Sequence, residues 1–208
     1  MTDVKICGLT RSEDVELACA LGARYVGFNF AEGSPRRVSP EAAAALADAT
    51  ADGVLRVGVF RSEGRDAIRR AVAAARLDLV QLHRRLTPED LEDARVPVIA
   101  VARPGGGGLD APDPKLLRRC HAILLDASEG RGVSLDPALV AQASWPVPMF
   151  AAGGLDGDTV GTVIRALRPA AVDVATGAES APGIKDRGKL ERLFRAVREA
   201  DEEASAAG

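Results

Sequence analysis

Residues 4–30 read VKICGLTRSEDVELACALGARYVGFNF and contain one complete strand–helix–strand unit. Val4–Cys7 and Tyr25–Phe30 are short and largely apolar, which is typical of strands buried on both faces of a parallel sheet. Between them, Ser12–Leu21 has apolar residues at helical spacing, and Gly22 follows as the expected helix stop. This stretch therefore predicts one parallel βα unit.

The same pattern recurs along the chain. Six further apolar runs follow: Leu55–Phe60, Leu79–His83, Pro97–Ala102, Ala122–Asp126, Val147–Ala152 and Ala171–Thr176. Between most of them lie segments with helical spacing: Ser39–Ala49, Gly64–Ala75, Asp156–Leu167 and Asp186–Ala200. The ends of the eight runs are 19 to 30 residues apart. Eight units of this size predict an α/β protein with one domain, a (β/α)8 TIM barrel over residues 1–200.

The competing fold is an open doubly wound sheet. That fold usually has fewer strands and a glycine-rich GxGxxG turn after its first strand. Here the first strand is followed by Gly8, Leu9 and Thr10, with no such motif. The barrel is therefore favoured.

Two helices of the barrel are expected to be short. Thr87–Ala94 allows only about two helical turns. The fifth helix is reduced to Pro114–Cys120, because the sequence RPGGGGLDAPDP at 103–114 cannot be helical. We interpret that glycine run as a flexible bridging loop, since it lacks the Lys-Ser/Thr of a P-loop. The polar tail 201–208 is expected to fray.

Composition excludes several classes of protein. The chain has 208 residues, of which 47% are hydrophobic, so it can build a sizeable core. A net charge of −3 and 3% aromatic residues argue against a nucleic-acid partner. The sequence has no apolar run of about 18 residues and no signal-like N-terminus, so we expect no membrane partner. Three widely spaced cysteines predict a reduced, cytoplasmic protein, and two histidines without a Cys/His cluster predict no metal site.

In a barrel, catalytic residues belong at the carboxyl ends of the strands. Cys7 ends the first run, where nearby N–H groups and a cation would lower its pKa and make a thiolate base available. The alternative is that Cys7 is inert packing, which is our interpretation of Cys19 and Cys120. Asp126 closes the run Ala-Ile-Leu-Leu-Asp, as a helix cap or as a proton donor favoured by partial burial.

Two glycine-containing turns follow the seventh and eighth strands. They are Gly153-Gly154 and Thr176-Gly177. The loops after these strands form the usual phosphate site of barrels, because exposed N–H groups there bind a dianion. The alternative is that these glycines only make tight turns.

Three more side chains are candidates for the mouth. Arg36 could bind a carboxylate with two parallel hydrogen bonds. His83 either orients a partner or is a hydrogen-bonded residue without a chemical role. Asp173 lies within the eighth strand and should face the barrel interior, where it either pairs with Lys5 or contacts a sugar hydroxyl.

Several of these segments resemble the phosphoribosylanthranilate isomerase family. They are VKICGLT (4–10), SPRRVSP (34–40), RVGVF (56–60), QLH (81–83), LLD (124–126), AGGL (152–155) and VDVATG with PGIKD (172–186). The match covers essentially the whole chain in order. Three segments depart from the family pattern: Arg84 replaces a glycine, Ala175-Thr176 replaces Ser-Ser, and residues 128–136 lack a Gly/Thr-rich loop. These departures concern the ring and phosphate contacts near Gly130–Ser134.

The resemblance implies an Amadori rearrangement in tryptophan biosynthesis, the third step from chorismate. Its substrate is N-(5'-phosphoribosyl)anthranilate and its product is 1-(2-carboxyphenylamino)-1-deoxy-D-ribulose 5-phosphate. In the family, the residue that matches Cys7 is the general base and the residue that matches Asp126 is the general acid. The arginine that matches Arg36 holds the anthranilate carboxylate. The phosphate rests on the two glycine turns. The resemblance implies no cofactor or metal, a small phosphorylated substrate as partner, and a monomer or homodimer.

Three rival functions remain for comparison. The histidine-pathway isomerase runs the same rearrangement, but it has an aspartate where Cys7 stands and shows half-barrel symmetry. A non-catalytic binder of phosphorylated ligands would keep the glycine turns without needing the pair Cys7 and Asp126. A Schiff-base aldolase would need a lysine inside the barrel, and Lys5 is the candidate.

Overall fold

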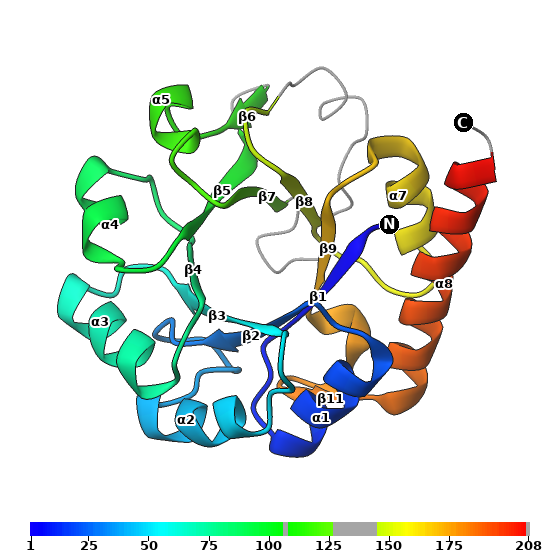
Figure 1. The fold of residues 1–208 in the computed structure, drawn as a ribbon, viewed down its shortest axis with the longest axis horizontal. Coiled ribbons are helices and arrows are strands. Elements are labelled where there is room, and N and C mark those ends of the chain that lie inside the picture. The colour runs from blue at the N-terminus through cyan, green and yellow to red at the C-terminus, as the bar shows by residue number, and fades with distance from the viewer. Residues whose placement is uncertain (106–107, 127–144, 207–208) are drawn as a thin grey trace.

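Eight parallel strands form a closed ring in the structure, a computed structural model that describes residues 1–105, 108–126 and 145–206 (Figure 1). The ring strands are β1 Asp3–Cys7, β2 Tyr25–Asn29, β3 Leu55–Phe60, β4 Leu79–Leu82, β5 Val98–Gly105, β7 Ala122–Asp126, β8 Met149–Ala152 and β9 Ala171–Val174. Each pairs with its neighbours along the chain, and the pairing of β1 with β9 closes the ring. The predicted (β/α)8 barrel is therefore confirmed.

Helices surround the ring (Figure 1). They are α1 Ser12–Leu21, α2 Pro40–Asp48, α3 Arg65–Ala74, α4 Pro88–Asp93, α5 Pro114–Leu117, α7 Val160–Leu167 and α8 Arg187–Ala206. α1 ends at Gly22, as predicted, where a φ of 101° lets the N–H close on the last carbonyls. The predicted shortening is also confirmed, since α4 has six residues and α5 has four. None of the described helices is both long and apolar enough to cross a bilayer.

Alternation along the strands produces two layers of core. In β5, Val98 and Ala100 pack outward in the layer shared with the helices, whereas Ile99 and Val101 pack inside the ring. Successive side chains of a strand point to opposite faces, so one strand serves both layers. The inward positions near the carboxyl end of each strand are therefore directed toward one mouth of the ring.

The glycine-rich segment is more ordered than predicted. β5 continues to Gly105 and pairs in antiparallel fashion with β6 Gly108–Asp110. The interpretation of this segment as only a flexible bridging loop is wrong for these residues, because ladder hydrogen bonds hold both arms; residues 106–107 lie outside the described part.

The C-terminal helix also differs from expectation. α8 continues through Ala206, so the expected fraying of residues 201–208 is wrong for 201–206, while 207–208 lie outside the described residues. The reason is a long-range contact: the Asp201 carboxylate accepts hydrogen bonds from Thr2 N (2.6 Å) and Thr2 Oγ1 (2.8 Å). The two ends of the chain therefore hold one another.

A small hairpin lies between β9 and α8. It consists of the 3-10 turn η1 Thr176–Ala178 and the antiparallel strands β10 Glu179–Ala181 and β11 Ile184–Lys185. β10 and β11 place Glu179 and Lys185 opposite each other. This hairpin brings charged side chains next to the barrel mouth.

Candidate active site

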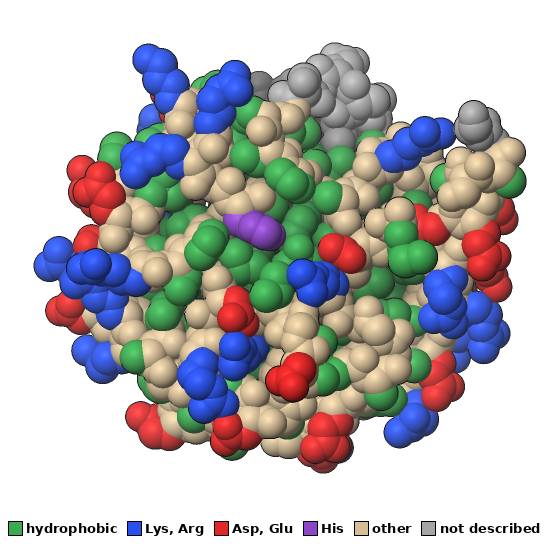
Figure 2. All heavy atoms as spheres, viewed as in Figure 1, with side chains coloured by type: hydrophobic (Ala, Val, Ile, Leu, Met, Phe, Trp, Pro, Cys, Tyr) green, Lys and Arg blue, Asp and Glu red, His purple; other side chains and the backbone are tan. Residues whose placement is uncertain are grey.

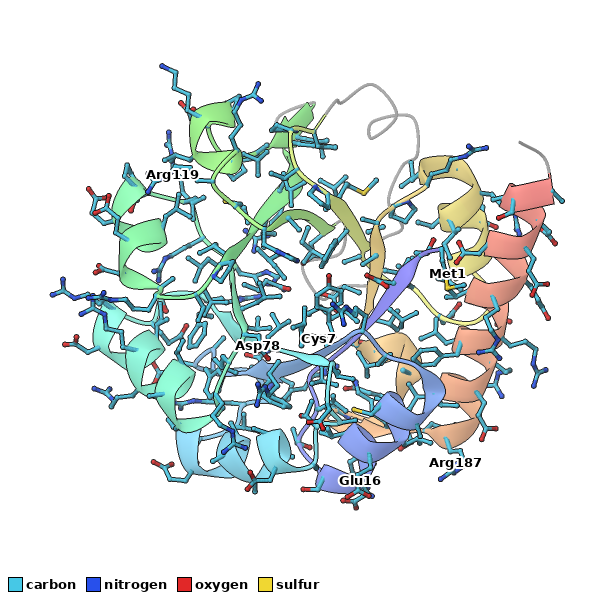
Figure 3. All side chains as sticks on the ribbon, in the orientation of Figure 1. Met1, Cys7, Glu16, Asp78, Arg119 and Arg187 are labelled. Atoms are coloured by element: carbon cyan, nitrogen blue, oxygen red, sulfur yellow. The ribbon has the colours of Figure 1, made fainter. Side chains whose placement is uncertain are left out.

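One cavity of about 850 Å³ lies at the carboxyl ends of the ring strands. All nine predicted site residues line it: Cys7, Arg36, His83, Asp126, Gly153, Gly154, Asp173, Thr176 and Gly177. The labelled Cys7 lies near the centre of the ring, while Glu16, Arg119 and Arg187 lie at the periphery (Figure 3). Figure 2 shows the opposite end of the barrel, where the strands begin; there, apolar side chains and a histidine gather near the centre and charged side chains surround them.

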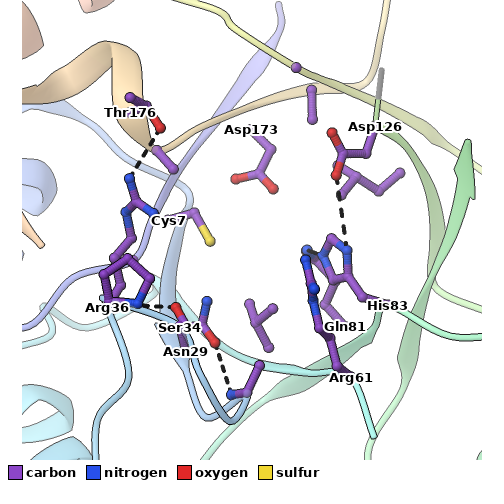
Figure 4. A pocket seen from close by; sticks show the side chains of 18 of the residues that line it. Cys7, Asn29, Ser34, Arg36, Arg61, Gln81, His83, Asp126, Asp173 and Thr176 are labelled. Atoms are coloured by element: carbon purple, nitrogen blue, oxygen red, sulfur yellow. Dashed lines mark hydrogen bonds and ion pairs between the residues drawn. The ribbon is translucent and has the colours of Figure 1, made fainter. Parts of the chain in front are cut away.

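Cys7 and Asp126 lie on opposite sides of this cavity, with Asp173 between them (Figure 4). Both are inward-facing at the last position of their strands, β1 and β7. Their relative exposures are 9% and 8%, so each is largely withdrawn from solvent while it lines the cavity. A thiol and a carboxyl group can therefore act on two sides of one bound molecule.

Lys5 and Asp173 form a buried ion pair, in which Asp173 lines the cavity. Lys5 Nζ donates to both carboxylate oxygens of Asp173 at 2.9 Å, and Lys5 has no exposed surface. Of the two alternatives for Asp173, pairing with Lys5 is the one observed. Burial lowers the pKa of Lys5, but Asp173 and Cys7 outweigh it and raise that pKa. Lys5 is thus held as an ammonium, which is the wrong form for a Schiff-base nucleophile.

The Cys7 thiol has a raised pKa. Burial is the main cause, and it outweighs the opposing effects of Lys5 and Lys185. The expectation of a lowered pKa is therefore wrong in direction, because desolvation of a thiolate is a larger effect than two nearby cations. Gly27, paired with Cys7 in the neighbouring strand, leaves the room that the sulfur occupies, since a Cβ there would lie 2.9 Å from Sγ.

Arg36 already binds a carboxylate of the protein itself. Its Nε and Nη2 donate to Oε1 and Oε2 of Glu179 at 2.8 and 2.7 Å, and Nη2 also donates to Thr176 Oγ1 at 3.1 Å. Its side chain crosses Gly8, whose φ of 72° and missing Cβ allow this close approach beside Cys7. The paired edge predicted for a substrate carboxylate is thus occupied, and among the described residues no hydrogen bond is made by Nη1, which leaves that edge to a ligand.

His83 is held by two neighbours beside Asp126. Arg103 Nη2 lies 2.9 Å from Nδ1, the side-chain amide of Gln81 lies 2.7 Å from Nε2, and Asp126 Oδ2 lies 4.0 Å from Nδ1. A guanidinium only donates, so Nδ1 accepts and the neutral ring carries its proton on Nε2, which requires Gln81 to present its Oε1. Burial lowers the pKa of His83 to about 4, so the ring is neutral at pH 7.

The two glycine turns touch each other at the cavity rim. Gly153 and Gly154 have φ values of 108° and 66°, which favour glycine strongly. At Gly177, a Cβ would overlap the carbonyl oxygen of Leu155, so the turns after β8 and β9 are in direct contact. Glycine is therefore required here for backbone conformation and for close approach.

Several residues of the site escaped the sequence-based reasoning. Asn29 lines the cavity without having been singled out, whereas Gln81, which also lines it, belongs to the quoted motif QLH. Glu179 and Lys185 lie beside it and are 5% and 6% exposed. Lys185 had a signal, since it belongs to the segment PGIKD that the resemblance singled out. Glu179 had none, because its pairing with Arg36 joins residues 143 positions apart.

The segment Gly130–Ser134 lies outside the described residues. Within the described ranges, no group of three or more His, Cys, Asp or Glu residues is arranged to hold a metal ion.

Known proteins of one family resemble this chain in sequence and in fold. The family model described as N-(5'-phosphoribosyl)anthranilate (PRA) isomerase matches residues 4–196. A relative named N-(5'-phosphoribosyl)anthranilate isomerase from Paramagnetospirillum magneticum is 37% identical, over 94% of this chain and 97% of its own. The phosphoribosyl anthranilate isomerase structure from Thermus thermophilus is 39% identical with a TM-score of 0.83, covering 95% of this chain and 99% of its own.

A third similar protein was solved with a ligand. It is a phosphoribosyl anthranilate isomerase in complex with reduced 1-(o-carboxyphenylamino)-1-deoxyribulose 5-phosphate. It is 30% identical to this chain with a TM-score of 0.83, and the match covers 96% of this chain and all of the other.

Proposed function

The chain belongs to the N-(5'-phosphoribosyl)anthranilate isomerase family, an isomerase of tryptophan biosynthesis, and from this premise we propose that Cys7 is its general base and Asp126 its general acid. The reaction converts N-(5'-phosphoribosyl)anthranilate into 1-(2-carboxyphenylamino)-1-deoxy-D-ribulose 5-phosphate. The observation that carries the proposal is one cavity with a thiol and a carboxyl group on opposite sides.

The first step opens the sugar ring. Asp126 donates a proton to the ring oxygen as the bond from C1 to that oxygen breaks, and the nitrogen lone pair forms a C1=N double bond. His83, whose ring is neutral at pH 7, lies beside this carboxyl group, with Nδ1 4.0 Å from Asp126 Oδ2. Such a proton transfer typically contributes a factor of about 10²–10⁴.

The second step removes a proton from C2. The Cys7 thiolate takes it, the C2–H electrons form a C1=C2 double bond, and the C1=N electrons return to nitrogen. The resulting enolamine gains a proton at C1 and loses the proton of its C2 hydroxyl, which gives the ketone. Neither step changes the oxidation balance of the whole molecule, so an acid and a base suffice.

The remaining predicted residues bind the substrate in this proposal. Arg36 holds the anthranilate carboxylate, and Gly153, Gly154, Thr176 and Gly177 hold the phosphate. The phosphate is remote from C1 and C2, so its binding energy serves to fix the ring between acid and base. His83 and Asp173 are proposed to contact the substrate from the walls of the cavity.

Replacing Arg36 with alanine is expected to raise KM about tenfold to a hundredfold with a smaller effect on kcat. The reason is that a charge-assisted hydrogen bond is worth about 1.5–3 kcal/mol. Arg37→Ala is the matched control, because Arg37 is exposed and does not line the cavity. Steady-state kinetics on both variants checks this, and equal KM values for the two would contradict the assignment.

Replacing Gly177 with alanine is expected to lower kcat/KM by about 10²-fold, because the added Cβ must push the two phosphate turns apart. Competitive inhibition by inorganic phosphate should weaken in parallel. Gly64→Ala serves as control, since a Cβ at Gly64 meets nothing within 4 Å. An unchanged phosphate inhibition constant in folded Gly177→Ala would remove these turns from the phosphate site.

Turnover itself is tested on substrate made in situ from anthranilate and phosphoribosyl pyrophosphate. The substrate fluorescence should fall when the protein is added, and the gene should restore growth of a tryptophan auxotroph lacking this isomerase. A pure protein that does neither would refute the proposed function. The histidine-pathway aminoaldose provides the comparison substrate, for which we expect no turnover.

We also propose that the enzyme acts in the cytoplasm on a free small phosphorylated substrate, as a monomer or homodimer. The three cysteines are free thiols, which suits a reducing compartment.

A further inference from the structure

Glu179 is the centre of a buried hydrogen-bonded cluster. Its Oε1 accepts from Arg36 Nε (2.8 Å), Lys185 Nζ (2.9 Å) and Gly183 N (3.1 Å), and its Oε2 accepts from Arg36 Nη2 (2.7 Å). The Glu179 side chain is only 3% exposed. One carboxylate therefore fixes two cationic side chains from distant parts of the chain.

Lys185 connects this carboxylate to the end of β1. Its Nζ donates to the carbonyl oxygen of Cys7 at 2.7 Å and to that of Ala175 at 3.1 Å, besides Glu179. An ammonium has three N–H donors, so all of them are used by the protein. Lys185 has no proton to spare for a substrate, and its contacts are with main chain and carboxylate only.

A continuous path thus links Arg36 to Cys7 through Glu179 and Lys185. These ends of the path are the residues that the proposed function assigns to substrate carboxylate binding and to proton abstraction. Burying paired charges gives little stability compared with an apolar cluster of the same shape. The position of this costly arrangement, between two functional groups, favours a role in the reaction.

We propose that Glu179 and Lys185 are positioning residues of the isomerase: Lys185 fixes the main chain at Cys7, and Glu179 fixes the guanidinium of Arg36 and orients Lys185. The inference rests on the proposed function, because it assumes that Cys7 and Arg36 act on the substrate. Neither Glu179 nor Lys185 touches substrate in this proposal.

The charges around Cys7 have a further consequence. The groups that face it are Lys5 and Asp173 from β1 and β9, Lys185 from β11 and Arg36 from the loop after β2, while Glu179 pairs the last two. Three cations and two carboxylates leave one excess positive charge, which a Cys7 thiolate would neutralise. Loss of Lys185 therefore disfavours the thiolate.

Lys185→Met is expected to lower kcat by about 10²-fold, with little change in KM, and to move the ascending limb of the kcat/KM pH profile to higher pH. Lys189→Met is the matched control. Lys189 Nζ donates to the main-chain oxygen of Glu179 at 2.6 Å. The control substitution therefore removes a neighbouring lysine but leaves the contacts of Cys7 and of the Glu179 carboxylate in place. The control should keep the wild-type pH profile.

Glu179→Gln tests the other arm of the path. Because Arg36 loses its fixed orientation, KM should rise about tenfold or more. In an Arg36→Ala background the same substitution should change KM little, since the residue that it positions is already absent. Full additivity of the two KM effects would contradict positioning through Arg36.

Folding is checked by circular dichroism and thermal unfolding of each variant. If Lys185→Met alone fails to fold, the double variant Glu179→Gln/Lys185→Met is used, because it also removes the buried carboxylate charge that Lys185 neutralises. The double variant should still show the lowered kcat, because the main chain at Cys7 has lost its hydrogen bond from Lys185. A folded variant with the wild-type pH profile and kcat overturns the inference.

The proposed function and the positioning role can be refuted independently of each other. Wild-type protein without turnover would refute the proposed function. The positioning role alone would be refuted if the wild-type protein turns over substrate, Cys7→Ser has a severe defect and Lys185→Met has none.

Discussion

Replacing Cys7 with serine is expected to lower kcat by about 10²–10⁴-fold while the barrel stays folded, because the loss is that of a general base. Serine is close to cysteine in size, so the pocket against Gly27 and Lys5 keeps its packing. A hydroxyl ionises far less readily than a thiol, so it cannot take the C2 proton. Cys19→Ser and Cys120→Ser are the matched controls, because neither residue lines the cavity.

The pH profile gives the same prediction a second readout. Burial raises the pKa of the Cys7 thiol, so the thiolate is the minor form at neutral pH and its fraction grows as pH rises. Wild-type kcat/KM should therefore increase with pH toward that pKa, and Cys7→Ser should lose this increase. A Cys7→Ser variant with near-normal turnover would show that another group is the base.

Replacing Asp126 with asparagine is expected to lower kcat by about 10²–10⁴-fold, because an amide of the same shape has no acidic proton for the ring oxygen. The substitution keeps the residue's size, so substrate binding should change less than kcat. Asp3→Asn is the control, since Asp3 is exposed and begins β1 rather than ending a strand at the mouth. Stopped-flow measurement of the fluorescence decay compares ring opening in the two variants.

The pH dependence of the two variants distinguishes the role of Asp126 as acid from that of Cys7 as base. In Asp126→Asn, the increase of activity with pH that Cys7 causes should remain, at a lower level. If Asp126→Asn kept normal kcat and Cys7→Ser did not, the acid would have to come from another wall of the cavity, and His83 would be the first residue to test.

The sequence predicted the fold well because its evidence is local. Each strand is a short apolar run, each helix has a matching apolar stripe, and eight such units in succession are typical of a closed barrel. The glycine-rich segment after β5 was harder to predict, because its hairpin depends on pairing between Arg103 and Asp110 rather than on local preference.

The site was predictable to the extent that it depends on position within strands. Alternation places Cys7, Asp126 and Asp173 inward, and the end of a parallel strand places them at one mouth. The turn glycines were found in the same way, because they directly follow the seventh and eighth strands in the sequence.

The sequence by itself determined the barrel, its mouth and the residues that reach it. The spacing of apolar residues, the order of the strands along the chain and the residue types at strand ends can all be read from short segments. The tertiary structure alone decided that the paired edge of Arg36 binds Glu179, 143 residues away, and that Lys185 holds the end of β1. It also decided the direction of the Cys7 pKa, because burial depends on the packing of the whole ring around the sulfur. Desolvation and long-range ion pairs exist only once distant segments meet, so no local pattern encodes them.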